Sequence, residues 1–270
     1  MGKLLFFEPA LSGNGKRSCA SCHRPEKAFT DHRGTSRALR FTANLTRNSP
    51  TLLASARQKT FFHDGRAANL GEVVRQVVEN PQELGSSYAQ LTGRLAESPA
   101  YRLAFRQALG TDITEASVNK ALAAYVTSLI SNNAAYDQAR RGQQPLPTIA
   151  LAGKRLFMGP AGCVGCHAAP DFRDGRRYLV RPGEWVKTPT LRNVALTPPY
   201  GANGQAATLL DVLGDAFHAA HRPRPLAPAE ASQLLAFLAA LTDTTSAEHR
   251  PPLALPALHS LPDRRVGGLY

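Results

Sequence analysis

The sequence predicts an all-α fold built from two similar halves. Apolar residues recur at helical spacing in several segments, and no convincing run of alternating apolar and polar residues indicates strands. One pattern of residues also occurs twice along the chain, which is typical of a duplicated unit. The length of 270 residues suffices for two domains of ordinary size, and 43% hydrophobic residues suffice for packed cores.

Three segments carry the clearest helical patterns. Residues 114–131 place their apolar side chains along one stripe, and residues 87–109 are predicted to form two short helices separated at Pro99. Pro228 suits the first position of a further helix, whose apolar face would contain Leu234, Phe237, Leu238 and Leu241. From about residue 243 onward the chain is rich in proline and is expected to run over the surface.

All four cysteines lie in two Cys-x-x-Cys-His motifs, at residues 19–23 and 163–167. Two thiols at this spacing can each form a thioether with one vinyl group of a single porphyrin, and the adjacent histidine then lies under the iron. The motifs therefore predict two covalently bound haem c groups. The attaching and proximal residues would be Cys19, Cys22 and His23 for one haem, and Cys163, Cys166 and His167 for the other.

Other uses of the cysteines explain less of the pattern. A four-cysteine zinc site would have to bring together pairs from distant parts of the chain, and it would leave the histidine after each pair without a role. A thioredoxin-like motif would need a surrounding βαβ pattern, which is not visible. Two disulfides are the remaining alternative.

The haem motifs belong to the duplicated pattern. Gly2-Lys3-Leu4-Leu5-Phe6 precedes the first motif, and Gly153-Lys154-Arg155-Leu156-Phe157 precedes the second. Downstream, Pro50-Thr51-Leu52 matches Pro189-Thr190-Leu191. The polar stretch near residues 142–148 separates the copies, so we predict one domain at residues 1–145 and a second at residues 146–270 that includes the proline-rich tail.

The formal charge of +12 predicts either a solvated basic surface or an acidic partner protein attracted by charge. A nucleic-acid partner is not expected, because no basic cluster is interleaved with aromatic residues. No apolar run reaches the roughly 18 residues that a membrane span needs. We find no signal peptide in the sequence, but haem is normally attached to this motif outside the cytoplasm, so we expect a periplasmic protein that has been exported.

These motifs resemble those of the bacterial di-haem cytochrome c peroxidases and their MauG-like relatives. The resemblance covers residues 2 to about 241 and includes Leu5-Phe6-Phe7-Glu8-Pro9, Arg47-Asn48-Ser49-Pro50-Thr51-Leu52, Asp64-Gly65-Arg66-Ala67, Asn80-Pro81-x-Glu83-Leu84 and Pro189-Thr190-Leu191-Arg192-Asn193-Val194. It implies two cytochrome c-like haem domains, with a peroxide-reactive haem in the first and an electron-transfer haem in the second. It also implies a calcium ion between them, bound by Asn48 and by the backbone carbonyls of Thr197 and Pro199.

The resemblance assigns two roles around the first haem. Many of these peroxidases close the sixth iron position with a removable histidine, but the matching neighbourhood of Leu39 contains no histidine or methionine. We therefore expect a five-coordinate or water-bound iron, and we interpret His32 as a surface or loop histidine. Glu83 matches the distal glutamate that moves a proton during peroxide cleavage, although alone it would be read as a helix-start residue. Val73 stands where a distal glutamine is expected.

The second haem departs further from the family pattern. The position that matches the usual sixth ligand is Ala216, which cannot bind iron, so His218 is the preferred candidate and His221 the second. In the alternative, both are surface histidines. His63 replaces the tryptophan that usually lies between the haems as an electron relay. The only tryptophan, Trp185, is interpreted as a core residue or as a surface relay toward a protein substrate.

Three functions are compatible with this pattern. The first is a MauG-like enzyme that uses hydrogen peroxide and high-valent haems to oxidise a residue on a partner protein. The second is a cytochrome c peroxidase that reduces peroxide with electrons from a small redox protein. The third is a di-haem electron carrier without catalysis. The vacant first haem, the absence of a methionine ligand at the second haem and His63 in place of the relay tryptophan favour the first function. The missing sixth ligand near Leu39 and the presence of Glu83 argue against the third.

Overall fold

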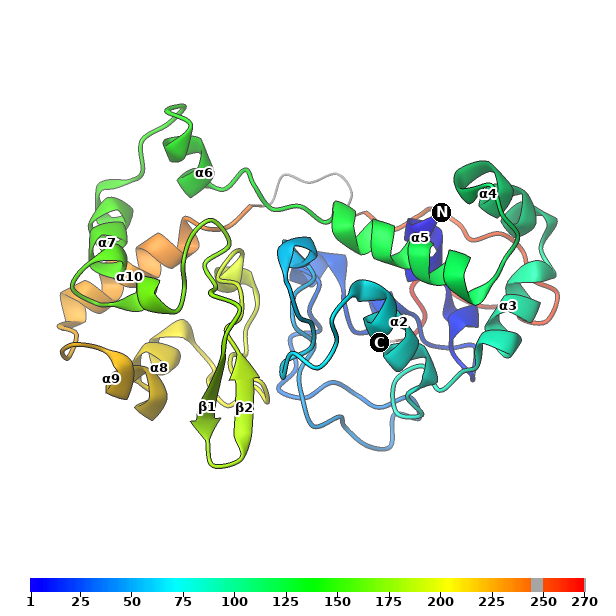
Figure 1. Cartoon of the computed structure of the whole chain (residues 1–270), viewed down its shortest axis with the longest axis horizontal. Coiled ribbons are helices and arrows are strands. Elements are labelled where there is room, and N and C mark those ends of the chain that lie inside the picture. The colour runs from blue at the N-terminus through cyan, green and yellow to red at the C-terminus, as the bar shows by residue number, and fades with distance from the viewer. Residues whose placement is uncertain (244–249, 270) are drawn as a thin grey trace.

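The computed structural model describes residues 1–243 and 250–269. Figure 1 shows an elongated molecule in which two helical halves lie side by side. The N-terminal half contains α1 (Gly2–Phe6), α2 (Leu70–Glu79), α3 (Tyr88–Ala96), α4 (Pro99–Leu109) and α5 (Glu115–Ser128). The C-terminal half contains α6 (Ala135–Arg140), α7 (Thr148–Met158), α8 (Leu209–Gly214), α9 (Ala216–His221) and α10 (Pro228–Ala239).

The helices predicted from the sequence are present, and their ends follow from local chemistry. Helix α5 begins where the Thr114 hydroxyl accepts a hydrogen bond from the Ser117 amide at 3.2 Å. Helices α4 and α10 begin at Pro99 and Pro228, because a proline at the first helical position sacrifices no hydrogen bond. No helix in the described part of the chain is long and apolar enough to cross a membrane.

The expectation of a purely helical protein is wrong in one segment. Strands β1 (Arg177–Arg181) and β2 (Glu184–Lys187) form an antiparallel hairpin that projects where the two halves meet (Figure 1). Its sequence alternates between partly buried and exposed residues, and Gly183 supplies the positive φ of +74° that the turn needs. The alternation is short and is interrupted by Pro182-Gly183, which is why the sequence pattern did not stand out.

Each half has its own hydrophobic core, and a glycine sets the closest helix contact in each. A Cβ atom at Gly2 of α1 would lie 1.9 Å from the Ala121 carbonyl oxygen of α5, and one at Gly153 of α7 would lie 1.9 Å from the Gln233 carbonyl oxygen of α10. Only glycine permits such an approach of two helix backbones. The long apolar helices α5 and α10 therefore sit directly on the helices that precede the haem motifs.

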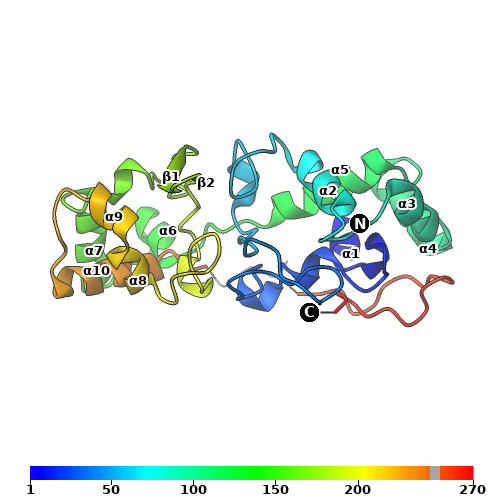
Figure 2. The same ribbon diagram turned by 90° about the horizontal axis from the view of Figure 1, so that it is seen from below.

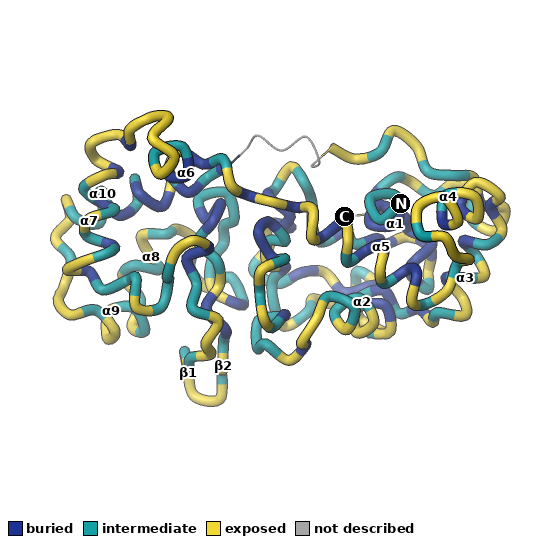
Figure 3. The backbone as a smooth tube through the Cα atoms, turned by 45° about the horizontal axis from the view of Figure 1, so that its top comes forward, coloured by how far each residue is buried: buried dark blue, intermediate teal, exposed yellow. Residues whose placement is uncertain are grey.

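Short 3₁₀ helices connect these elements where the chain turns around the cores. They are η1 (Pro9–Leu11), η2 (Cys19–Ser21), η3 (Pro25–Lys27), η4 (Ser55–Arg57), η5 (Cys163–Gly165) and η6 (Val194–Leu196). Figure 3 shows that the most buried stretches lie inside the two halves, whereas the turn of the hairpin is exposed. Much of the chain near the haem motifs is irregular and is held by individual hydrogen bonds.

The C-terminal tail is placed differently from the assignment made from the sequence. We assigned it to the second domain, but residues 250–269 return to the N-terminal half, beneath which they run in Figure 2. The Gly267 amide donates to the Phe7 carbonyl at 2.8 Å, and the Ser18 hydroxyl donates to the Gly267 carbonyl at 2.7 Å. Residues 244–249 and 270 of the predicted tail lie outside the described residues.

A buried ion pair fastens this tail. The Arg264 guanidinium donates to the Glu8 carboxylate at 2.6 Å, and both side chains are almost fully buried, with exposures of 4% and 0%. The Tyr101 hydroxyl donates to the same carboxylate at 2.6 Å. Removing one partner of such a pair leaves a buried charge without compensation, which destabilises a protein strongly.

We therefore expect Arg264→Ala to lower the free energy of unfolding by about 3–5 kcal/mol. Urea denaturation followed by circular dichroism would measure the change. The matched control is Arg265→Ala, because the neighbouring Arg265 is exposed. Equal effects of the two substitutions would show that the buried pair does not fasten the tail.

Candidate functional site

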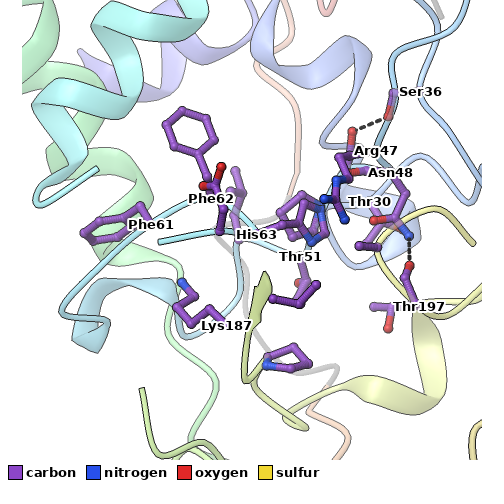
Figure 4. A pocket seen from close by; sticks show the side chains of 18 of the residues that line it. Thr30, Ser36, Arg47, Asn48, Thr51, Phe61, Phe62, His63, Lys187 and Thr197 are labelled. Atoms are coloured by element: carbon purple, nitrogen blue, oxygen red, sulfur yellow. Dashed lines mark hydrogen bonds between the residues drawn. The ribbon is translucent and has the colours of Figure 1, made fainter. Parts of the chain in front are cut away.

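A large cavity lies between the two halves and reaches both Cys-x-x-Cys-His motifs. It has a volume of about 1090 Å³, and Cys19, Cys22, His23, Cys166 and His167 all line it. This volume lies slightly above the roughly 300–1,000 Å³ that is typical of small-molecule sites. Figure 4 shows side chains from both halves around it, including His63, Lys187, Asn48 and Thr197. We call it the inter-half cavity.

The two motifs fold in the same way. Cys19–Ser21 and Cys163–Gly165 each form one turn of 3₁₀ helix. The His23 amide then donates to the Cys19 carbonyl at 2.9 Å, and the His167 amide donates to the Cys163 carbonyl at 2.9 Å. Each turn thus presents two thiols and one imidazole within a compact segment, as attachment to a single porphyrin requires.

The imidazole rings are oriented by matching hydrogen bonds. Nδ1 of His23 lies 3.0 Å from the Phe29 carbonyl oxygen, and Nδ1 of His167 lies 3.0 Å from that of Phe172. A carbonyl oxygen can only accept, so Nδ1 carries the proton and Nε2 keeps its lone pair for a metal. Burial lowers the pKa of both histidines, that of His167 to about 4, so both are neutral near pH 7.

The cysteines have the properties of thiols rather than of zinc ligands. All four are free, and burial raises the pKa of Cys22 and Cys163 and brings that of Cys19 to about 12. In the described part of the chain, no three histidine, cysteine, aspartate or glutamate side chains gather in a way that could hold a metal ion. The Cys-x-x-Cys-His geometry therefore leaves haem attachment as the interpretation that also uses the histidine after each pair.

An unsatisfied arginine beside the first motif also fits a bound haem. Arg17 is buried, and its Nη2 donates to the Cys22 sulfur at 3.1 Å and to the Arg37 carbonyl at 2.7 Å. Its Nη1 is buried without a hydrogen-bond partner. A buried guanidinium nitrogen is costly unless an acceptor reaches it, and a haem propionate would supply one. The thiols, the free imidazole nitrogen and this cation together suit a haem in the N-terminal half.

Glu83 reaches the inter-half cavity from the turn after α2. Its amide donates to the Asn80 carbonyl at 3.0 Å, and the Asn80 side-chain amide donates to its carboxylate at 2.8 Å. Burial raises the pKa of Glu83, and the Asn80 hydrogen bond and the Arg66 charge partly oppose this shift. The negative charge of Glu83 also raises the pKa of Cys19 and Cys22, so the carboxylate lies close enough to interact with both thiols of the first motif.

Valines from α2 form the rest of the wall around Glu83. They are Val73, Val74, Val77 and Val78, and all of them line the cavity. The departure at Val73 therefore replaces a polar group with an apolar one at the cavity surface. The nearby loop supplies no strong iron ligand: Leu39 is buried with its amide bonded to the Gln82 carbonyl at 2.7 Å. In the described N-terminal half, the only histidines that line the cavity are His23 and His63, and no methionine does.

His218 lies by the second motif and His221 does not. His218 lines the cavity, and its Nδ1 lies 3.0 Å from the Asp215 carboxylate, which leaves Nε2 available. It also lowers the pKa of His167, although burial lowers that pKa most. The exposed His221 turns its Nδ1 to the Phe217 carbonyl at 2.8 Å and is not among the residues lining the cavity.

His63 occupies a central position where the halves meet. Its Nε2 donates to the Asn48 carbonyl at 3.0 Å, and its own carbonyl accepts from the Lys187 amide at 2.7 Å. Burial lowers the pKa of His63, so the ring is neutral near pH 7. His32, in contrast, is an exposed loop residue whose Nε2 donates to the Leu196 carbonyl at 2.8 Å.

The residues predicted to bind calcium meet at the same boundary. The Asn48 side-chain amide lies 2.8 Å from the Gly201 carbonyl oxygen and 3.5 Å from that of Pro199. The Thr197 hydroxyl donates to the Val194 carbonyl at 3.1 Å. In this arrangement Asn48 directs its nitrogen toward the carbonyls, so calcium binding would require the amide to turn its oxygen inward. The site remains a prediction.

Sequence reasoning did not single out several residues of the cavity, among them Arg17, Lys187 and Tyr178. Lys187 is buried, donates to the Thr60 carbonyl at 2.6 Å and to the Gln58 side chain, and burial lowers its pKa to about 8. Tyr178 on β1 also lines the cavity. Only the short alternation of the hairpin could have signalled Tyr178, and nothing local distinguishes Lys187 from a surface lysine. The core interpretation of Trp185 is wrong, because 53% of this residue is exposed.

Comparisons with known proteins agree with this geometry. The family described as di-haem cytochrome c peroxidase matches residues 1–145. The methylamine utilization protein MauG of Methylorubrum extorquens is 34% identical over 79% of this chain, but the match spans only 66% of that protein. The cytochrome c551 peroxidase of Nitrosomonas europaea is 32% identical over 96% of this chain and 82% of its own. A crystal structure of a MauG-like protein associated with microbial copper homeostasis superposes with a TM-score of 0.81 and 26% identity, covering 94% of this chain and 92% of that one.

The geometry of the two motifs yields a test of haem attachment. We expect Cys163→Ala combined with Cys166→Ala to halve the covalent haem per chain, because each pair of thiols serves one porphyrin. Haem-to-protein stoichiometry by absorbance of the pyridine complex, together with intact mass, would measure this. The matched variant is Cys19→Ala with Cys22→Ala, which should lose the other haem. Retention of both haems in either variant would contradict the assignment.

Proposed function

The chain belongs to the di-haem cytochrome c peroxidase family, and from this premise we propose that it is a MauG-like oxidase, which uses hydrogen peroxide to oxidise a residue on a partner protein. The observation that supports the proposal best is the wall of the cavity near the first motif. It offers Glu83 and the α2 valines, but no methionine and no histidine from the loop around Leu39. Peroxide needs such an open position on the iron.

Glu83 would supply the proton transfer that peroxide cleavage requires. Haem iron supplies the redox chemistry when it is bound. The Glu83 carboxylate would take a proton from one peroxide oxygen and return it to the other, which would leave as water, and a bound haem would supply the two electrons that break the O–O bond. Asn80 holds the carboxylate at 2.8 Å and thereby fixes its direction. The surrounding valines limit the water that could compete for this proton.

His218 would be the second axial ligand of the haem at His167. The contact between His218 Nδ1 and Asp215 orients the ring as a ligand histidine is usually oriented, with its other nitrogen free. Two histidine ligands give a lower potential than histidine with methionine, because a thioether favours reduced iron. A low potential would help the second haem to share oxidising equivalents, which supports the MauG-like proposal over a simple peroxidase.

We also propose that the two halves are copies of one haem-binding unit, divided near residue 145. Matching contacts support this. The Thr51 hydroxyl donates to the Ala28 carbonyl at 2.6 Å, and the Thr190 hydroxyl donates to the Asp171 carbonyl at 2.6 Å. Each threonine oxygen then accepts the amide two residues on, at 3.2 Å in both halves. The hydrogen bonds of the two proximal histidines match in the same way.

A calcium ion at Asn48, Thr197 and Pro199 and a periplasmic location complete the proposal. The contact of Asn48 with carbonyls of the opposite half supports a role for this residue in holding the halves together. Haem attachment at two Cys-x-x-Cys-His motifs supports an extracytoplasmic site of maturation.

Equilibrium dialysis with ⁴⁵Ca²⁺ would test whether the protein binds calcium, and Asn48→Ala should abolish this binding.

The peroxidase alternative keeps one specific argument. The cytochrome c551 peroxidase of Nitrosomonas europaea matches almost the whole chain, whereas the MauG match covers less of it. Such an enzyme would reduce peroxide to water with electrons from a small redox protein. Rapid, repeated turnover with such a donor would favour this alternative, whereas covalent change in a partner residue would favour the oxidase. An inert protein with two low-spin haems would indicate a plain electron carrier.

Glu83→Gln tests the proton-transfer role. We expect the rate of reaction with peroxide to fall by about 10²–10⁴-fold, because an amide cannot accept the proton. Stopped-flow absorbance of the ferric protein would measure it. The matched control is Glu79→Gln, which alters an exposed glutamate near the end of α2. A loss of less than threefold in Glu83→Gln would remove the residue from the mechanism.

The pH dependence of the same rate should follow Glu83. Burial raises the pKa of this carboxyl, and the base must be deprotonated to accept a proton. The rate should therefore decrease as the pH falls through the raised pKa and should be full above it. In Glu83→Gln this inflection should disappear. A profile that keeps the inflection would assign it to another group.

Axial variants test the second haem. We expect His218→Ala to convert the second haem to a high-spin form and His218→Met to raise its reduction potential, because the ligand would change from imidazole to thioether. Electron paramagnetic resonance and spectroelectrochemistry would measure the two effects. His221→Ala should leave both unchanged. If His221→Ala instead produced the high-spin signal, the sixth ligand would be the other histidine of α9.

A further inference from the structure

The β1–β2 hairpin is a single layer of sheet with two different faces. Tyr178 and Val186 are cross-strand partners, and both line the inter-half cavity. Leu179 and Trp185 are the next pair, and they point the other way, with 48% and 53% of their surfaces exposed. Alternation along a strand places neighbouring residues on opposite faces. The hairpin therefore forms a wall of the cavity on one side and an exposed apolar pair on the other.

Positive charge surrounds the exposed pair. Arg176 and Arg177 are exposed, and neither forms an ion pair among the described residues. With Trp185 they line a shallow depression that also includes Gly65 and Gly175. The nearby carboxylates are already engaged. Asp64 pairs with Arg66 at 3.1 Å, and Glu184 pairs with Arg47 at 2.6 Å.

On the inner side, the hairpin reaches the second haem motif. The Tyr178 hydroxyl donates to the Asp174 carboxylate at 2.6 Å. The Cys166 thiol also lies within hydrogen-bonding reach, and Asp174 and Cys166 together raise the pKa of this tyrosine. Tyr178 and Trp185 thus belong to adjacent cross-strand pairs, and Tyr178 contacts Cys166 of the second haem motif. Aromatic side chains on the two faces of one hairpin would give electrons a short path between the exterior and the second haem motif.

We propose that the outer face of the hairpin, formed by Leu179 and Trp185 and bordered by Arg176 and Arg177, is the docking and electron-entry surface for an acidic partner protein. The proposal rests on the proposed function and identifies the partner by its chemistry. The exposed side chains of Leu179 and Trp185 would pack against an apolar patch on the partner. The two arginines, which form no ion pair among the described residues, would face carboxylates around that patch. The overall charge of +12 would attract the same partner from a distance.

The electrons balance with peroxide as oxidant. Two one-electron oxidations of the docked partner at Trp185 would deliver two electrons, and Tyr178 would lie on their path toward the haem that Cys163, Cys166 and His167 would hold. With two protons they reduce one hydrogen peroxide to two water molecules. The partner can lose these electrons from a redox centre or from a side chain. In either case the oxidised group must lie close to the apolar contact with Trp185, inside the acidic rim.

The test uses the haem-loaded full chain and two reduced small c-type cytochromes as probes, one with negative and one with positive net charge. Peroxide-dependent oxidation of each probe is followed at low and high ionic strength. Wild-type protein should oxidise the acidic probe faster, and salt should remove the difference. Arg176→Gln combined with Arg177→Gln should lower kcat/KM for the acidic probe at low salt by about tenfold or more, mainly through KM.

Trp185→Ala should lower kcat/KM for the acidic probe at both ionic strengths, whereas Trp185→Phe should restore much of it. The matched controls are Leu103→Ala on α4 and Arg140→Gln on α6, which alter exposed residues away from the hairpin (Figure 1). Stopped-flow reaction with peroxide without a probe should be the same in all these variants. This readout separates a loss of docking from damage to the peroxide site.

The outcomes distinguish the two proposals. If wild-type protein does not react with peroxide, the proposed function fails. If it reacts with peroxide and oxidises the acidic probe, but the hairpin variants behave like the controls, only the docking inference is overturned. A preference for the basic probe, or oxidation of neither probe by a peroxide-reactive protein, would also overturn it. Mass spectrometry of the acidic probe would show whether a side chain or only its redox centre was oxidised.

Discussion

The hydrogen bond from each proximal imidazole to a backbone carbonyl is the constraint around which the two halves are arranged. It fixes the proton on Nδ1 of His23 and His167 and leaves Nε2 for iron. The accepting residues, Phe29 and Phe172, have φ values of +59° and +53°, which place their carbonyls toward the rings. Non-glycine residues adopt this conformation only where surrounding contacts determine it. Both phenylalanine rings are fully buried in the cores, so the packing of each half maintains the imidazole position.

The inter-half cavity depends on contacts that cross between the halves. Arg57 donates to Asp171 at 2.9 Å through Nε, and Lys187 donates to the Thr60 carbonyl at 2.6 Å. The side-chain amide of Asn48, in the N-terminal half, donates to the Gly201 carbonyl of the C-terminal half at 2.8 Å. Several of these contacts involve charged groups that are partly or wholly buried, which makes them costly to break. The halves therefore present their haem motifs to one shared space, and a change at the boundary would affect both.

Three departures from the family pattern lie along this shared space. Val73 makes the wall near Glu83 less polar, His63 is a neutral imidazole held by Asn48, and His218 lines the cavity with its Nδ1 held by Asp215. In the function that we propose, these residues would leave few polar groups around the peroxide and would favour transfer of oxidising equivalents toward the second motif. The β1–β2 hairpin lies between that motif and the exterior, where we propose that a protein partner docks.

The sequence by itself determined the parts whose chemistry is local. The spacing of Cys19, Cys22 and His23 within one turn requires no distant contact, and neither do the helix starts at Pro99 and Pro228. The tertiary structure alone decided which distant residues meet. It exposed Trp185, buried Lys187, returned the tail to Glu8 and placed His218 rather than His221 in the cavity. Burial and charge pairing depend on contacts between segments far apart in the chain, and no local pattern of residues encodes them.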